Sequence, residues 1–383
     1  MDGNIIDFVK IESFPNRFLL SLRVVSVFRD RQAMLNNYFS SEDVAQFRVW
    51  MEWADNYVIM AHKSPDGDAV GSSLALCLFL QSKGKNVKVV FPDCPPDFLM
   101  WMSGASEIMT YDSNPDGISD MIYKADVLCC LDFNSPGRVE GMAAPLLYSR
   151  AKKIMIDHHP NPSGFCDVIL SHPDSSSTSE LVFHLLCALG EWGNVTRQIA
   201  ECICTGMITD TGGFAYNSNS SQFFYIISQL IDKNVDKDAL FRKVFNNYSE
   251  YRLRLTGFVL TEKMRIYKGC RTALITLSQS EQERYHCQSG DTEGFANMPL
   301  QISGVLFSVF MREFGNGKIR VSLRSTQGVP CDRFSGDYFH GGGHRSASGG
   351  EFTGTLDECV RELERGLEEW RKSDEDCIIQ LFR

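Results

Sequence analysis

The sequence predicts an α/β protein in which a domain with a parallel sheet is joined by a helical linker to a smaller α/β domain. Its 383 residues are more than one domain usually requires. Between about residues 40 and 245, short and continuously apolar segments alternate with helical patterns, which is typical of parallel strands that helices cover on both faces. The segment 236–267 is charged, has few glycines and is helical in pattern, so we expect it to connect this domain to the next.

The first domain is predicted to begin with a helix. Ser40 and Asp43 have the spacing of a capping box at its start, and the helix should end near Asn56, ahead of a strand. Four apolar segments are then predicted to be buried strands, and three further segments to be helices. The strands are expected at 57–60, 87–91, 127–131 and 153–156, and the helices at 71–83, 179–189 and 196–207.

The C-terminal part carries the signals of a second, smaller domain. Two strand-like segments, 304–310 and 318–323, flank a Phe-Gly-Asn-Gly turn. A glycine-rich loop is expected at 341–350, and an amphipathic helix at 356–370. We therefore divide the chain into an N-terminal extension of unknown role (1–39), the first domain (40–245), a helical linker (246–267) and the second domain (268–383).

Composition limits the classes of function. Acidic residues outnumber basic ones by 48 to 38, and the resulting net charge of −10 disfavours a protein that coats long nucleic acids. The N-terminus lacks a signal-peptide pattern and no apolar run reaches the ~20 residues of a membrane span, so we expect a soluble, cytoplasmic protein. The 13 cysteines, an odd number without CxxC spacing, fit buried thiols better than disulfides or zinc ligands.

Polar side chains that can bind metals follow three of the predicted strands and one helix. Because the carboxyl ends of parallel strands meet at one edge of a sheet, we expect these side chains to lie together. Each of them alone would fit a helix cap, a turn or a core histidine, but their coincidence predicts a shared metal site. The residues are His62, Asp66, Asp68, Asp132, Asp157, His158, His159 and Asp210.

The ligand types indicate which metal and which reaction to expect. Carboxylates and imidazoles without a thiolate suit Mn²⁺ or Mg²⁺ better than structural zinc. Two ions side by side need a bridging carboxylate, and Asp66 and Asp68, two residues apart, can each face one ion. Such a pair generates a hydroxide and stabilises in-line displacement at phosphorus, so the sequence predicts hydrolysis of a phosphoester.

The order and spacing of these residues resemble those of the DHH phosphoesterase superfamily. The sequence Gly341-Gly-Gly-His344 resembles the signature of its DHH-associated C-terminal domain. The two-domain size and the sequence Ser177-Thr-Ser-Glu-Leu181 are most similar to the NrnA-type nanoRNases, which are bifunctional oligoribonucleases and phosphatases of 3′-phosphoadenosine-5′-phosphate (pAp). The resemblance implies an active site in the cleft between the two domains.

The resemblance also implies a role for each strand-end residue. One ion would be held by His62, Asp66 and Asp132, and the other by Asp68, Asp132, His158 and Asp210, with Asp132 as the bridge. Asp157 would orient a histidine, and His159 would face the scissile phosphate as hydrogen-bond donor or general acid. Ser64 departs from the family, which often has Asn at this position, and the first 40 residues have no counterpart in it.

Substrate contacts are expected mainly from the second domain. A triple glycine lets the backbone approach a phosphate and form an anion nest, although by itself it would indicate only a flexible turn. Arg138 is the candidate from the first domain, where an ordinary surface arginine fits equally well. The expected substrate-binding residues are Arg138, Arg324, Gly341, Gly342, Gly343, His344 and Arg345.

The function that the resemblance implies is a hydrolase with two Mn²⁺ ions, or Mg²⁺ in their place. It would cut single-stranded RNAs of about two to five nucleotides and dinucleotides to mononucleotides, and dephosphorylate pAp, while the negative net charge repels long polymers and duplexes. The alternatives are a cyclic- or linear-dinucleotide signalling phosphodiesterase and a non-catalytic nucleotide-binding regulator. A RecJ-like exonuclease and a DHH-type pyrophosphatase fit the sequence less well. A homodimer is left open.

Overall fold

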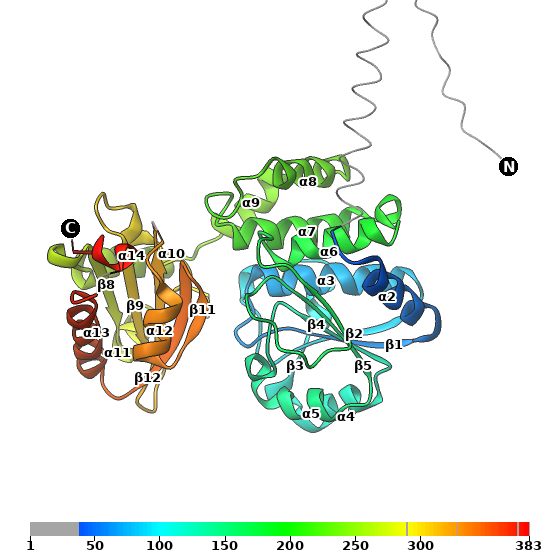
Figure 1. Ribbon diagram of the computed structural model, residues 1–383, viewed down its shortest axis with the longest axis horizontal. Coiled ribbons are helices and arrows are strands. Elements are labelled where there is room, and N and C mark those ends of the chain that lie inside the picture. The colour runs from blue at the N-terminus through cyan, green and yellow to red at the C-terminus, as the bar shows by residue number, and fades with distance from the viewer. Residues whose placement is uncertain (1–37, 289, 327, 374, 383) are drawn as a thin grey trace, which may run out of the picture.

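The computed structural model describes residues 38–288, 290–326, 328–373 and 375–382. These residues form two lobes, each built on a six-stranded sheet (Figure 1). Of the N-terminal extension expected over 1–39, all but Tyr38 and Phe39 lies outside the described residues.

The first sheet is parallel throughout, as predicted. Its strands follow the order β3-β2-β1-β4-β5-β6, so that β1 and β4 lie at the centre. The four predicted strands are present, whereas the edge strands β3 and β6 were missed because they contain only two and four residues. The bounds are β1 Asn56–Met60, β2 Asn86–Phe91, β3 Met109–Thr110, β4 Val127–Leu131, β5 Lys152–Asp157 and β6 Val168–Ser171.

Helices cover both faces of this sheet (Figure 1). The first helix, α2, begins after Ser40, whose side chain accepts a hydrogen bond from the Asp43 N–H, as the sequence predicted. On one face lie α2 Ser41–Trp53, α3 Gly67–Ser82, α6 Thr178–Ala188 and α7 Arg197–Asp210, and on the other α4 Pro115–Lys124 and α5 Ala143–Tyr148. Two further helices, α8 Ser221–Asp232 and α9 Lys237–Phe245, pack against α7.

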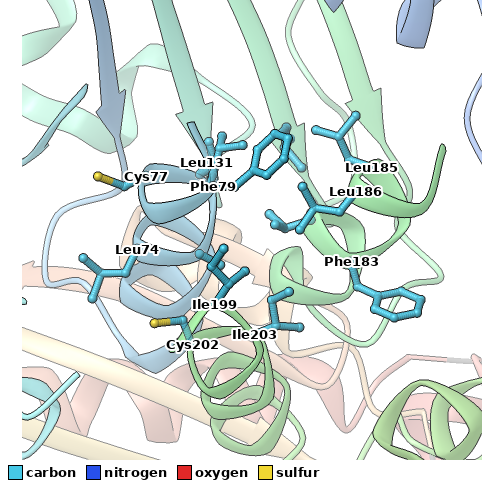
Figure 2. Packing of buried hydrophobic residues seen from close by; sticks show 14 of the residues in the cluster. Leu74, Cys77, Phe79, Leu131, Phe183, Leu185, Leu186, Ile199, Cys202 and Ile203 are labelled. Carbon is cyan, nitrogen blue, oxygen red and sulfur yellow. The ribbon is translucent and has the colours of Figure 1, made fainter. Parts of the chain in front are cut away.

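The antiparallel pair α3 and α7 forms the centre of the larger core, which contains Leu74 of α3 and Ile199 and Ile203 of α7 (Figure 2). Glycines allow the two helices to approach closely. A Cβ atom on Gly71 would lie 2.6 Å from the Cys202 carbonyl oxygen, and one on Gly206 would lie 2.7 Å from the Asp68 Oδ1 atom of α3. The start of α3 therefore lies beside the end of α7, which brings two acidic segments of the sequence together.

Two helix ends differ from the sequence prediction. Helix α3 begins at Gly67, four residues earlier than expected, because the Asp66 side chain accepts hydrogen bonds from the backbone N–H groups of Asp68 and Ala69. Helix α7 continues to Asp210, three residues beyond the expected end. Both differences place metal-ligand candidates on helix ends instead of in loops.

A short helical segment leads into the second domain. It consists of α10 Glu250–Phe258 and one π-helical turn, Val259–Lys263. The second sheet is mixed, with β8 and β9 parallel and the other neighbours antiparallel, in the order β11-β12-β10-β9-β8-β7. Its strands are β7 Arg265–Tyr267, β8 Thr272–Leu277, β9 Phe307–Glu313, β10 Lys318–Ser325, β11 Gly342–His344 and β12 Ala347–Thr353.

Helices α12 and α13 cover one face of the second sheet, and α10 packs on the opposite face of β8 and β9. Phe334 of α12 and Leu363 of α13 pack in the core formed with β9 and β10, and the predicted helix 356–370 is confirmed. The helices of this domain are α11 Gln279–Arg284, α12 Cys331–Phe339, α13 Leu356–Trp370 and α14 Asp376–Ile379.

The glycine-rich segment 341–350 is not the loop that the sequence predicted. It forms most of the hairpin β11–β12, because its glycines let the hairpin pack tightly against α12. A Cβ atom on Gly341 would collide with the Gly349 carbonyl oxygen and the Ser335 hydroxyl, and one on Gly350 would lie 2.5 Å from the Phe339 carbonyl oxygen.

Two further expectations can be compared with the structure. Among the described residues, no helix is long and apolar enough to cross a membrane. All 13 cysteines lie in the described part of the chain, each is a free thiol, and most are buried, so the buried-thiol prediction is confirmed.

Candidate two-metal centre

The strand-end side chains converge at the carboxyl edge of the first sheet. His62 follows β1, Asp132 follows β4 and Asp157 ends β5, while Asp66 and Asp210 come from the facing ends of α3 and α7. Groups of three of these side chains place one ligand atom each within 4.8 Å of one another. The structure therefore brings together all eight residues that the sequence predicted.

The first of these groups contains His62, Asp66 and Asp132. The His62 Nε2 atom lies 3.3 Å from Asp132 Oδ2 and 4.0 Å from Asp66 Oδ2. Its Nδ1 atom lies 2.8 Å from the Lys63 carbonyl oxygen. A proton on Nδ1 would satisfy this hydrogen bond and leave Nε2 free to bind a metal.

The second group contains Asp68, His158 and Asp210. The His158 Nε2 atom lies 3.5 Å from Asp210 Oδ2, and its Nδ1 atom lies 3.3 Å from the Ser175 carbonyl oxygen. Burial lowers the pKa of His158, but the charges of Asp210 and Asp132 outweigh this and raise the pKa to about 9. A cation at this position would therefore displace a proton from the imidazole.

Asp132 lies between the two groups. Its Oδ2 atom faces His62, while its Oδ1 atom lies 3.7 Å from His158 Nε2 and accepts a hydrogen bond from the Thr178 hydroxyl. Its backbone has φ +61°, a left-handed conformation that Asp tolerates better than most residues. One carboxylate thus offers a separate oxygen to each group, as a bridging ligand must.

Asp157 holds the third histidine. The carboxylate is fully buried, and its Oδ1 atom lies 2.8 Å from His159 Nδ1. Its Oδ2 atom has no hydrogen-bond partner among the described residues. This contact fixes the His159 ring and directs its other nitrogen away from Asp157.

The pKa values of the carboxyl groups reflect their crowding. Burial, followed by the charges of Asp132 and Asp210, raises the pKa of Asp68 well above its usual range. Burial also raises the pKa of Asp210 to about 6, although the charge of His158 opposes this. Burial acts in the same direction on Asp132, but the hydrogen bond with His62 holds its pKa below the usual range. Bound cations would offset the repulsion between these carboxylates.

The second domain reaches the site through His344. Its ring centroid lies 4.8 Å from that of His159 and 5.2 Å from that of His158. Burial, and then the charges of these two histidines, lower the pKa of His344 to about 3. His344 is therefore neutral at neutral pH and can donate or accept one hydrogen bond.

Two arginines of β10 lie on the face of the sheet opposite α12 and α13. Burial lowers the pKa of Arg324, whose Nη1 donates to the Leu323 carbonyl oxygen at 2.9 Å. Arg320, two residues earlier, donates through Nη1 to the Ser64 hydroxyl of the first domain at 3.1 Å. These residues bring the positive charge of the second domain toward the acidic edge of the first.

The remaining substrate-binding candidates are placed differently. Arg138 is half-buried. Burial lowers the pKa of His62, but the hydrogen bond with Asp132 outweighs burial and raises it, and the charge of Arg138 opposes this rise. Arg345 is exposed and donates through Nε to the Gly328 carbonyl oxygen. The Gly341 N–H donates to the Ser335 carbonyl oxygen, so it is not available for the anion nest that the sequence suggested.

Comparison with known proteins identifies the family. Residues 56–207 match the N-terminal domain of the DHH family, and residues 277–372 match the DHHA1 domain. The bifunctional oligoribonuclease and PAP phosphatase NrnA of Thermus thermophilus is 30% identical over 297 residues, which are 77% of this chain and 84% of that protein. The chain belongs to the DHH family.

Two further relatives bear on the function. A solved structure of an exopolyphosphatase-related protein from Bacteroides fragilis is 49% identical, with a TM-score of 0.83 and coverage of 87% of this chain and 97% of that chain. The cyclic-di-AMP phosphodiesterase GdpP of Geobacillus thermodenitrificans is 25% identical over 327 residues, which cover 82% of this chain and 47% of that protein.

The DHH match contains seven of the eight strand-end residues, and only Asp210 lies beyond it. The donor set fits divalent cations that prefer oxygen and imidazole, because the three-residue groups contain only Asp and His side chains. The raised pKa of Asp68 is the feature expected where a cation completes the site.

The sequence interpretation missed the backbone support of the ligands. The N–H groups of Thr178 and Ser179, at the start of α6, donate to the two oxygens of Asp68 at 2.7 and 2.9 Å. The spacing of Ser177 and Glu180 is that of a capping box, so the sequence did contain a signal for a helix start. In the structure, the Ser177 hydroxyl accepts a hydrogen bond from the Glu180 N–H. Arg320 was also missed, although it shares a face of β10 with Arg324.

Proposed function

We propose that this DHH-family phosphoesterase hydrolyses short single-stranded oligoribonucleotides and dinucleotides to mononucleotides and removes a phosphate from pAp. The observation that carries the proposal is the position of Asp132, which offers one oxygen to each of two groups of metal-ligand type. The similarity to NrnA over most of the chain supports this choice of substrate. A cytoplasmic location and a homodimer remain predictions.

The first domain would hold the two cations. His62, Asp66 and Asp132 would bind one, and Asp68, Asp132, His158 and Asp210 the other. Mn²⁺ is the ion that we propose first, and Mg²⁺ is the alternative. When bound, such a pair neutralises charge on the phosphate and makes water a stronger nucleophile at neutral pH.

His159 would supply the proton. Asp157 accepts the hydrogen bond of its Nδ1 atom at 2.8 Å and orients the ring. The Nε2 atom can then donate to an oxygen of the scissile phosphate or protonate the leaving oxygen. His344, whose ring is stacked on that of His159, would exclude water from this side and donate a hydrogen bond to the substrate.

The second domain would bind the rest of the substrate. Arg324 and His344 face the acidic edge and would contact a phosphate or the ribose, and Arg138 would add a contact from the first domain. Gly342, where a Cβ atom would meet nothing within 4 Å, leaves room for a phosphate close to the backbone. The approach of the two domains at His344 and at Arg320 favours substrates with few nucleotides.

A cyclic-dinucleotide phosphodiesterase is the second candidate. It is favoured by the similarity to GdpP, which extends over 82% of this chain. This chain spans only about half of that relative, so the similarity does not include the rest of the GdpP chain.

The test is an analysis of reaction products. The purified chain would be incubated with 5′-phosphorylated diadenylate (pApA), pAp or cyclic di-AMP, with Mn²⁺ or with a chelator. Mononucleotide from pApA and phosphate from pAp, both dependent on the metal, would support the proposal. Turnover of cyclic di-AMP alone would favour the second candidate. Binding without hydrolysis under any divalent ion would indicate a regulator.

A further inference from the structure

The segment 175–179 contacts several of the proposed metal ligands. The Ser175 carbonyl oxygen lies 3.3 Å from His158 Nδ1, the N–H groups of Thr178 and Ser179 donate to Asp68, and the Thr178 hydroxyl donates to Asp132. Both proposed ions would therefore depend on the position of this one segment. All five of its residues are buried.

Glu180 binds this segment through its residue Ser176. Its Oε2 atom accepts hydrogen bonds from the backbone N–H of Ser176 at 2.9 Å and from the Ser176 hydroxyl at 2.5 Å. Its Oε1 atom lies 3.6 Å from the Nε2 atom of His184, one helical turn further along α6. A buried carboxylate is costly unless it is paired, and these contacts stabilise its charged form. They hold the pKa of Glu180 below its usual value, against the effect of burial.

Tyr38, which lies outside the residues that match the DHH domain, also contacts this segment. Its hydroxyl lies 2.6 Å from the Ser175 hydroxyl, and its ring is stacked on that of His184, with centroids 3.8 Å apart and an angle of 2°. His172 packs against the ring of Tyr38, with centroids 4.4 Å apart. Tyr38 precedes the DHH match, which begins at residue 56, by 18 residues.

We infer that Tyr38, Glu180 and His184 are positioning residues that fix the segment 175–179 for metal binding. The inference rests on the proposed two-metal function. None of the three touches a proposed metal ligand directly, and each acts through Ser175, Ser176 or the start of α6. Tyr38 lies at the end of the N-terminal extension, so this end of the extension would help to position the active site.

The test compares Mn²⁺ affinity with turnover. Tyr38→Phe removes one hydroxyl and keeps the ring stacked on His184, so it changes the contact with Ser175 alone. We expect Mn²⁺ affinity, measured by electron paramagnetic resonance of free Mn²⁺, to fall about 3- to 10-fold. Glu180→Ala should lower it by about 10- to 100-fold, the range known for residues that orient metal ligands. In both variants kcat for pApA should fall, and KM should stay within about twofold.

Three controls separate positioning from general destabilisation. Tyr148→Phe, at a side chain that is 79% exposed, should match the wild type in every readout. Glu180→Gln keeps an oxygen that can accept from Ser176 and should recover most of the affinity lost in Glu180→Ala. Saturating Mn²⁺ should restore most of the kcat of Tyr38→Phe, which a general loss of stability would not allow.

The outcomes are distinct. If the wild type hydrolyses pApA and Tyr38→Phe binds Mn²⁺ as tightly as Tyr148→Phe, the inference is wrong even if Glu180→Ala does not fold. If the wild type binds no Mn²⁺ and leaves pApA intact, the proposed function fails first, and the inference fails with it.

Discussion

The two sheets of this protein present their polar side chains in different ways. In the first, helices bury both faces, and the carboxyl edge carries His62, Asp132 and Asp157 at or just after the ends of three strands. In the second, the strands alternate, and β10 buries Val321 and Leu323 against α12 and α13. The first arrangement concentrates acidic groups and imidazoles at a point, whereas the second spreads arginines along a face.

This difference predicts that the first domain acts mainly in metal binding and turnover and the second mainly in substrate binding, a division of labour between the domains. A concentrated group of carboxylates repels itself and binds cations, so changes there should reduce metal binding and kcat. A face with arginines and a neutral histidine attracts phosphate, so changes there should raise KM. The following variants test this division, from the largest expected effect to the smallest.

Asp132→Asn should have the largest effect. The amide offers one oxygen where the carboxylate offers two, so it cannot serve both groups, and we expect kcat/KM for pApA to fall about 10³-fold. Asp126→Asn is the matched control, because Asp126 precedes the same strand at its other end. The division of labour would be wrong if Asp132→Asn kept more than a tenth of the wild-type activity.

Asp210→Asn should lower turnover about 10²-fold but stabilise the metal-free protein. Burial raises the pKa of Asp210 from 3.8 to about 6, so its charge opposes folding at neutral pH, and its removal should add about 1–3 kcal/mol to the free energy of unfolding. Below pH 6 the folded wild type takes up a proton and the penalty fades, so the gain should be full at pH 8 and small near pH 4.

Denaturant unfolding of both metal-free proteins at several pH values measures this effect. A variant that is less stable at pH 8, or a gain that grows toward acid pH, would contradict the sign of the argument.

Arg324→Ala should raise KM for pApA about 10-fold or more and leave kcat within about threefold, because a charged hydrogen bond to the substrate is lost. Arg345→Ala offers a comparison on the same domain. Its guanidinium contacts Gly328, so we expect a smaller rise in KM. Steady-state kinetics of the two variants measures both parameters. If kcat of Arg324→Ala fell by as large a factor as KM rose, Arg324 would act in the chemical step and not only in binding.

Ser64→Asn should have the smallest effect. Ser64 has φ +53°, a left-handed conformation that Asn adopts more readily, and an amide oxygen can still accept from Arg320. We expect a gain of about 0.5 kcal/mol in the free energy of unfolding. Ser228→Asn, on the exposed face of helix α8, should give no gain. A loss of stability in Ser64→Asn would show that the serine contacts matter more than the backbone.

The sequence predicted the first domain well because its strands are buried on both faces and therefore stand out as apolar segments. Because the carboxyl ends of parallel strands meet at one edge of a sheet, the residues from His62 to Asp210 could be grouped into one site from the sequence alone. The backbone donors at Thr178 and Ser179 could not be predicted in the same way, because every residue has an N–H group and only the folded chain shows which ones point at Asp68.

The second domain was predicted less completely. The helix 356–370 was visible from its apolar face, but the hairpin β11–β12 was mistaken for a loop, since glycine disfavours strands in general. Its structure depends on the close packing of Gly341 and Gly350 against α12, which is a tertiary effect. The role of Tyr38 could not be predicted from the sequence either, because its hydroxyl contacts that of Ser175, which lies 137 positions away in the chain.

The number of Mn²⁺ ions bound per chain tests the central claim most directly. Equilibrium dialysis of the wild type, Asp132→Asn and Asp126→Asn would count them. We predict two ions for the wild type and for Asp126→Asn, and no more than one tightly bound ion for Asp132→Asn. A wild type that binds a single ion, or an Asp132→Asn variant that keeps both, would contradict a site in which one carboxylate joins two metals.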